Sequence, residues 1–267
     1  MTTPPSSHVA LHGVTKVFES GLGRIEALGP IDLELHQGEF FAVVGPSGCG
    51  KSTLLDIIAA LTPPSSGTVM FEGQPIGERV PDGIGVVFQE NACFPWLDVA
   101  DNITFGLRRQ PVDKAEIERR LRYALQLMGL GDFARAFPSQ LSGGMRQRVC
   151  IARTLVMQPR LILLDEPFGA LDQQTRLLMG DELLRIWRAT GATVLLITHA
   201  LDEAAMLADR VAVMSARPGR IMEVIETGWP RDRDSQIVSA PEFGAITSRL
   251  WTLLRAQSMH ALQPGTT

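Results

Sequence analysis

The chain has 267 residues, of which 45% are hydrophobic and 20% charged, an ordinary composition for one large α/β domain or two small ones. Its formal net charge of −4 gives no basic footprint, so we expect no nucleic acid partner, and no apolar run approaches the about 18 residues of a membrane span. The three cysteines are scattered, which predicts neither a disulfide framework nor a metal site and fits a reducing, cytoplasmic setting.

The N-terminal part is predicted to be an antiparallel β portion. Residues 1–7 are expected to be disordered, and the start MTTPPSSHVA lacks the basic and apolar stretches of a signal peptide. Segments 9–18 and 31–35 alternate apolar and polar residues, as half-buried strands do. Segment 67–76 is expected to be a strand that enters a turn.

A glycine-rich loop, GPSGCGKST, joins a predicted buried strand at 40–44 to a predicted helix at 52–61. The free backbone amides of a helix start favour an anion, and glycines let the backbone wrap closely around a phosphate. Lys51 can reach the outer phosphates and the Ser52 hydroxyl can hold Mg²⁺, as in the P-loop pattern G-x-x-x-x-G-K-[ST]; the alternative is a chance glycine turn. The residues expected to bind ATP phosphates are Gly45, Pro46, Ser47, Gly48, Cys49, Gly50, Lys51, Ser52 and Thr53.

The rest of the chain alternates predicted strands with predicted helices. A helical pattern covers 98–136, whereas the sequence after 216–220 is less apolar and predicts no clear element. Alternating strands and helices favour a mostly parallel sheet. We therefore predict an α/β fold, with a P-loop NTPase core, an N-terminal antiparallel β portion and a helical insertion. The remaining predicted strands lie at 85–89, 160–165, 192–198 and 211–214.

Polar side chains close three of these strands. Asp165 ends one strand at the edge where open α/β sheets bind ligands, so its carboxylate is suited to the Mg²⁺ shell, and Glu166 can polarise a water that attacks the γ-phosphate. Gln89 can contact both the metal and that water, and His199 closes a third strand as a catalytic candidate. The structural alternatives are a helix cap for the two acids, a surface glutamine and a structural histidine.

The segment LSGGMRQRV, 141–149, is the most specific motif. Ser142 and two glycines precede an amphipathic helix, so a second helix start can bind an anion. The alternative is an ordinary serine N-cap with flexible glycines. Two such sites far apart in one sequence suggest that the second serves a nucleotide held by another copy of the chain.

Together these motifs resemble the ATP-binding subunit of ABC transporters. GPSGCGKST (Walker A), VVFQE (Q-loop), LSGGMRQRV (signature), LILLDEP (Walker B), FGALD (D-loop) and ITH (switch) occur in the family's order. The resemblance implies a head-to-tail homodimer that sandwiches ATP between one subunit's Walker A loop and its partner's signature. The residues implied to contact the partner's nucleotide are Ser142, Gly143, Gly144 and Gln147, and those implied to hold Mg²⁺ are Ser52, Gln89 and Asp165.

The resemblance also implies roles for single residues. Phe18 matches the family's aromatic residue that stacks on adenine, with Phe71 and Gln74 as less favoured alternatives. Glu166, His199 and Gln89 are implied to be catalytic. Ala200 departs from the family, which usually has an acid after the switch histidine, and this departure concerns the orientation of that histidine.

A finer resemblance is to importers of nitrate, alkanesulfonates and taurine, carried by FQENACFPWLDVADNITFGL at 88–107 and LADRVAVMSARPGRI at 207–221. It implies permease subunits, an extracytoplasmic substrate-binding protein and a peripheral position at the cytoplasmic face of the cell membrane. Segment 91–99, with Phe94, Trp96 and Leu97, is the expected permease docking surface, or else core of the helical insertion. The predicted domain spans 8–250, with the helical insertion at about 92–155 and a tail at 251–267.

Three rival functions stay open. A soluble ABC ATPase that acts on DNA or the ribosome usually has a long coiled-coil insertion or a second cassette, and neither is visible in the sequence. A small-molecule kinase needs no LSGG motif or D-loop. A non-catalytic nucleotide-binding subunit is disfavoured because Glu166 and His199 are intact.

Overall fold

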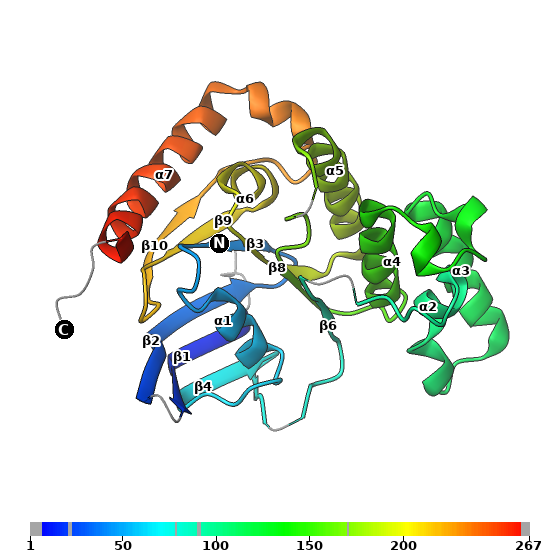
Figure 1. Cartoon of the computed structure of the whole chain (residues 1–267), viewed down its shortest axis with the longest axis horizontal. Coiled ribbons are helices and arrows are strands. Elements are labelled where there is room, and N and C mark those ends of the chain that lie inside the picture. Colours follow the sequence, from blue (N-terminus) through cyan, green and yellow to red (C-terminus); the bar gives the residue numbers. More distant parts are fainter. Residues whose placement is uncertain (1–6, 21–22, 78, 90–91, 170, 263–267) are drawn as a thin grey trace, which may run out of the picture.

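The computed structural model describes residues 7–20, 23–77, 79–89, 92–169 and 171–262 (Figure 1). Of the segment expected to be disordered, all but Ser7 lies outside the described residues. Ser7 begins the first strand, β1.

The N-terminal sheet is antiparallel, as predicted, and its strand order is β2-β1-β4-β5. The first two strands are longer than their apolar alternation indicated, because pairing continues along the hairpin as far as Ser20 opposite Gly23. The bounds are β1 (Ser7–Ser20), β2 (Gly23–His36), β4 (Ser66–Phe71) and β5 (Gln74–Pro75).

The second sheet has six strands in the order β10-β9-β3-β8-β7-β6. Every neighbouring pair is parallel except β10 with β9, which confirms the prediction of a mostly parallel sheet. Since parallel strands align their carboxyl ends, the segments that follow β3, β6, β7 and β8 meet at one edge. The bounds are β3 (Phe40–Val44), β6 (Ile84–Val87), β7 (Leu161–Asp165), β8 (Thr193–Thr198), β9 (Arg210–Met214) and β10 (Ile221–Glu226).

Helix α1 (Lys51–Ile58) lies between the two sheets. Phe41 and Val43 of β3 share a core with Leu54 and Ile58 of this helix and with the inner face of the N-terminal sheet. The alternate residues of β3 belong to the core on the opposite face. Burial on both faces explains why the central strands are uninterrupted apolar runs.

The opposite face of the six-stranded sheet is covered by α4 (Gly143–Leu155), α5 (Gln173–Thr190) and α6 (Leu201–Leu207). Trp187 of α5 is fully buried and packs edge-on against Phe40, with 5.7 Å between the ring centroids. Its indole Nε1 donates a hydrogen bond to the Gly38 carbonyl at 3.1 Å, so this large side chain joins the helix layer to the sheet.

The helical insertion contains α2 (Val99–Thr104) and α3 (Lys114–Leu127), which lie beyond α4 from the sheets (Figure 1). The helical pattern expected over 98–136 corresponds to two separate helices, because the segment is divided by their N-caps. Asp98 and Asp113 each accept a backbone hydrogen bond of 2.8 Å in the first turn of the helix that follows. Short 3₁₀ turns complete the insertion at Leu107–Arg109, Gly131–Phe133 and Pro138–Gln140.

The C-terminal part forms elements that the sequence pattern did not indicate. After β10 come a 3₁₀ turn (Ser235–Ser239) and α7 (Pro241–Leu262), which packs on α6 and β9 along one side of the molecule (Figure 1). The predicted start of the tail at residue 251 falls inside this helix. None of the helices in the described ranges has the length and apolar character needed to cross a membrane.

Candidate active site

The glycine-rich loop connects the carboxyl end of β3 to the first turn of α1. Gly50 has a φ of 105°, and a Cβ there would lie 2.6 Å from Leu28 and 2.9 Å from the Ala27 carbonyl, so the position requires glycine. The Lys51 ammonium donates to the Gly45 carbonyl at 2.9 Å and to the Pro46 carbonyl at 3.1 Å. The lysine therefore lies across the mouth of the loop, next to the amides that begin α1.

Asp165 ends β7 beside this loop and is buried. Burial raises the pKa of its carboxyl group, while a hydrogen bond from the Ser52 hydroxyl opposes that shift. Its Oδ1 has no hydrogen-bond partner among the described residues. A buried, unpartnered carboxylate oxygen next to a hydroxyl suits a hard cation such as Mg²⁺.

The Glu166 carboxylate is held between two side chains from neighbouring strand ends. Its Oε2 lies 3.0 Å from Gln89 Nε2 and 3.1 Å from His199 Nδ1. The backbone of Glu166 has a φ of 45°, and its amide donates to the Ile197 carbonyl at 2.8 Å, which fixes the residue against β8. The predicted strand at 85–89 was too long: β6 ends at Val87, so Gln89 lies in the following loop.

The glycine-rich loop, Gln89, Glu166 and His199 line one cleft of about 640 Å³ at the carboxyl edge of the sheet, whereas Asp165 is not among its described lining residues. Phe18, 41% exposed, lines it from β1, whereas neither Phe71 nor Gln74 is among its described lining residues. The cleft brings the loop, Glu166, Gln89 and His199 together from four separate segments of the chain. Its described lining comprises Phe18, Ile25, Ala27, Ser47, Gly48, Gly50, Lys51, Ser52, Thr53, Gln89, Glu166, His199 and Arg217.

Arg217 is a cleft residue that the sequence reasoning missed. Its guanidinium donates two hydrogen bonds to the Gly48 carbonyl, at 3.0 and 3.2 Å, and so contacts the glycine-rich loop directly. Arg217 follows β9, which neighbours β3 in the sheet, and this position could have indicated that Arg217 lies at the carboxyl edge.

The signature segment lies elsewhere. Ser142 caps α4, its hydroxyl accepting from the Met145 amide at 3.2 Å, and Gly143 and Gly144 form the first turn. Ser142 and Gly144 line a different cleft, of about 550 Å³, and no described residue lines both clefts. Gln147 is only 4% exposed, and its Nε2 has no hydrogen-bond partner among the described residues. Within one chain, then, the signature does not share the cleft of the glycine-rich loop.

Of the expected docking segment, 91–99, the structure describes 92–99, and its last residue begins α2. Trp96 is 69% exposed, while Phe94 is half-buried against Phe105 and Trp96, with 4.5 and 5.6 Å between ring centroids. Fully buried Asn102 holds the segment in place, accepting from the Phe94 amide at 2.8 Å and donating to the Phe94 and Leu97 carbonyls at 3.1 and 2.9 Å. The segment therefore exposes the Trp96 side chain, while Phe94 and the backbone are held by packing and by hydrogen bonds to Asn102.

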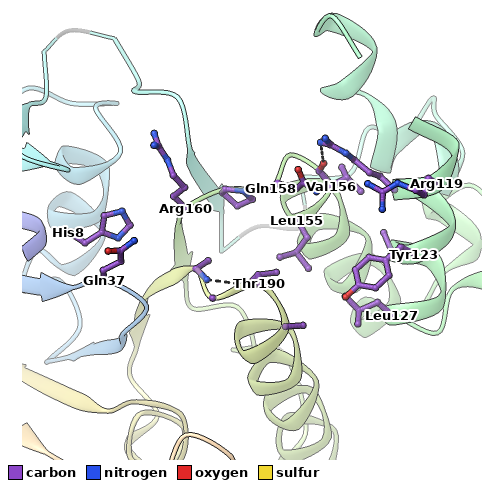
Figure 2. A pocket seen from close by; sticks show the side chains of 16 residues that line it. His8, Gln37, Arg119, Tyr123, Leu127, Leu155, Val156, Gln158, Arg160 and Thr190 are labelled. Atoms are coloured by element: carbon purple, nitrogen blue, oxygen red, sulfur yellow. Dashed lines mark hydrogen bonds between the residues drawn. The ribbon is translucent and has the colours of Figure 1, made fainter. Parts of the chain in front are cut away.

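A further cleft, of about 530 Å³, opens between the helical insertion and the sheets. Figure 2 shows Tyr123 and Leu127 of α3 on one side and His8 and Arg160 on the other. None of the predicted site residues is among its described lining, so this opening is separate from the cleft that holds Glu166.

Comparisons with known proteins agree with this geometry. Residues 28–169 match the family model described as ABC transporter. A nitrate import ATP-binding protein of Synechocystis is 41% identical, with 94% of this chain and 96% of that protein covered. A taurine import ATP-binding protein of Pseudomonas aeruginosa is 42% identical, with coverages of 91% and 94%. A dimeric ATP-binding cassette solved with ADP and phosphate is 33% identical and superposes with a TM-score of 0.73, covering 82% of this chain and 98% of that one.

Proposed function

The chain belongs to the ABC transporter family and is an ATPase, and from that premise we propose that it powers an importer for a small anion of the nitrate, sulfonate or taurine class. The observation that carries ATP hydrolysis is the Glu166 carboxylate, held by Gln89 and His199 in the cleft that Lys51 also lines. The import names of the two relatives support the class of substrate.

ATP is proposed to bind with its phosphates on the glycine-rich loop. The backbone amides from 45 to 53 and the Lys51 ammonium supply positive partial and full charge at the start of α1. Phe18 lies at the same cleft and is 41% exposed, with Lys16 Nζ 5.0 Å from its ring centroid, and the adenine is proposed to stack on this ring.

Mg²⁺ is proposed to bind at Ser52, Gln89 and Asp165. The unpartnered Oδ1 of Asp165 and the Ser52 hydroxyl fit a hard cation. Across the described residues no three His, Cys, Asp or Glu side chains gather as a metal site, so the remaining ligands would be phosphate oxygens and water. When bound, the ion supplies positive charge that offsets the negative charge developing on the phosphates.

Glu166 is proposed to accept a proton from the attacking water. Gln89 and His199 fix the carboxylate from two sides, which limits it to one orientation toward the cleft. Because Nδ1 of His199 faces Glu166, its Nε2 is the ring nitrogen proposed to donate to the γ-phosphate. Glu166 then activates the water and His199 stabilises the developing charge, and both act at the same phosphate.

The homodimer is proposed to complete each site. Ser142, Gly143 and Gly144 present a helix start away from their own chain's Glu166 cleft, so they are available to a nucleotide bound by the partner. Gln147 lies buried below that turn, and its unpartnered amide is proposed to join the contact after closure. Dimeric cassette structures support the arrangement.

The permease is proposed to dock on 92–98 through Trp96, at the cytoplasmic face of the membrane. The segment follows Gln89 closely along the chain, so changes at the γ-phosphate would reach it over a short path. A substrate-binding protein would act on the outer side of the same permease. A soluble ABC ATPase that is not coupled to transport is the alternative, and the import names of the relatives weigh against it.

The deciding experiment is the solution mass and turnover of Glu166→Gln, with and without ATP and Mg²⁺. Loss of the base should leave ATP binding intact and slow hydrolysis by about 10²- to 10⁴-fold. ATP should then convert the variant from a monomer into a dimer, seen by light scattering. Normal hydrolysis would show that Glu166 is not the base, and a chain that stays monomeric with ATP bound contradicts the ATP-dependent homodimer.

A further inference from the structure

We propose that Cys93 and Cys150 form a redox-sensitive dithiol site, which a hydroperoxide converts into an intramolecular disulfide. Their sulfur atoms lie 3.5 Å apart, although the residues come from a loop and from α4. Both are free cysteines in the structure. The site is separate from the proposed ATP-binding cleft, because neither residue is among that cleft's described lining.

The geometry allows the bond to form with a small movement. A disulfide needs sulfur atoms about 2.05 Å apart, so the present 3.5 Å separation has to close by about 1.5 Å. Cys150 is held in α4 and only 4% exposed. Cys93 is half-buried and lies outside any helix or strand, so this residue can make the movement.

Arg153 places a positive charge beside both thiols. Its guanidinium lies 4.0 Å from Cys150 Sγ, donates to the Ala92 carbonyl at 2.8 Å and stacks over the Phe94 ring at 4.9 Å. The hydrogen bond from Cys93, helped by this charge, lowers the pKa of Cys150 to about 7 despite burial, and it raises the pKa of Cys93. Near neutral pH the pair therefore shares one negative charge, which a reactive dithiol requires.

Cys49 provides the contrast within the same chain. It is also buried, but burial raises the pKa of its thiol, and it is not hydrogen-bonded to another cysteine in the described residues. A buried, protonated thiol is unreactive toward peroxide. Cys49 is thus an internal control for any treatment of the intact protein.

The proposed chemistry is a two-electron oxidation. The Cys150 thiolate attacks one peroxide oxygen, while the O–O bond breaks and the leaving hydroxide takes a proton from solvent to become water. Cys93 then loses its proton to solvent and attacks the Cys150 sulfenic acid. The S–S bond forms, the S–O bond breaks and the departing hydroxide is protonated to a second water. Both thiols are oxidised, and hydrogen peroxide is reduced to water.

The disulfide would connect two functional segments of the proposed ATPase subunit. Segment 92–98 follows Gln89, and Ser142 is the N-cap of α4, so a disulfide would fix the docking segment to the signature helix. This consequence rests on the proposed function. We expect the oxidised protein to lose most of its ATPase activity and to recover it after reduction with dithiothreitol.

The test treats the full-length protein with hydrogen peroxide, blocks remaining thiols with iodoacetamide under denaturing conditions and maps the peptides by mass spectrometry. The expected product is a cross-linked pair containing Cys93 and Cys150, with Cys49 alkylated. Alkylation of Cys93 and Cys150 after peroxide, or oxidation of either residue without a cross-link, would overturn the proposal.

Two variants check the order of events and the link to activity. In Cys93→Ser, Cys150 should stop at the sulfenic acid and be trapped by dimedone. In Cys150→Ser, which lacks the thiolate, Cys93 should remain a thiol, and peroxide should leave the activity at that of the same variant in its reduced form. If the disulfide is mapped but the ATPase activity is unchanged, the claim that the disulfide inhibits the ATPase is overturned. If the reduced protein has no ATPase activity, the proposed function is contradicted instead.

Discussion

Glu203 is a buried carboxyl group directly behind the switch histidine, and sequence reasoning missed it. Its Oε2 accepts a hydrogen bond of 2.7 Å from the Thr198 hydroxyl, which itself accepts from the Ala200 amide at 3.0 Å. The carboxyl therefore braces the residues on both sides of His199, at a position where Ala200 offers no acid of its own. Burial raises the pKa of Glu203 from 4.5 to about 7.

This raised pKa predicts a pH-dependent stability. The contribution of Glu203 is fully present below its unfolded pKa of 4.5 and is lost as the pH rises through about 7, because the folded state holds the proton more tightly. Glu203→Gln cannot ionise, so we expect it to be more stable than the native protein at pH 8 by about 1 to 3 kcal/mol, with the difference shrinking toward pH 4.5. Urea unfolding at several pH values measures this, with exposed Glu118→Gln as the control. A difference that does not change with pH would contradict the assignment.

Phe18 offers a second prediction for a single side chain. If adenine stacks on its exposed ring, Phe18→Ala should weaken ATP binding by about 1 to 3 kcal/mol, since aromatic stacking on a base has that magnitude. Phe18→Tyr keeps the ring and should bind ATP like the native protein. Titration with a fluorescent ATP analogue gives both dissociation constants. Equal affinity in the alanine variant would remove Phe18 from the site.

At the scale of elements, the loop over 92–98 depends on one buried residue of α2. Asn102 is fully buried and bonds to three backbone groups of Phe94 and Leu97. Asn102→Ala leaves those groups without partners, so we expect the free energy of unfolding to fall by about 2 to 3 kcal/mol. Trp96→Ala, which removes an exposed side chain of the same loop, should change it by less than about 0.5 kcal/mol. Urea unfolding compares the two, and equal effects would refute the role of Asn102.

The strands of the central sheet were predictable because burial on both faces leaves a continuous apolar run, as in β3, β7 and β8. The same runs located Asp165, Glu166 and His199 at their ends. The division of the insertion into separate helices, with N-caps at Asp98 and Asp113, could not be predicted from its helical periodicity alone. Arg217 contacts a loop distant in sequence, Asn102 bonds to backbone groups and Glu203 bonds to a single hydroxyl, and none of these contacts belongs to a sequence motif.

At the scale of the whole molecule, the proposed homodimer predicts that two inactive chains can complement each other. Ser142→Arg disrupts the signature and Lys51→Ala disrupts the glycine-rich loop. A homodimer of either variant therefore has a defect at both of its ATP sites. A mixed dimer has one intact site, built from the loop of the first chain and the signature of the second. We expect ATP to dimerise the mixture, but neither chain alone, when both also carry Glu166→Gln. Light scattering reads the result, and a mixture that stays monomeric would exclude shared sites.

The position of β3 in the sheet has a consequence for synthesis of the protein. This strand leads into the glycine-rich loop, yet its neighbours are β8 and β9, which are encoded more than half a chain later. On the ribosome the strand, apolar on both faces, must therefore wait for its first partner until Thr198 has emerged and for its second until Met214 has emerged. Such late pairing slows folding and exposes aggregation-prone surface. Prematurely terminated products should thus collect in inclusion bodies, and slower, cooler expression should increase the yield of folded chain.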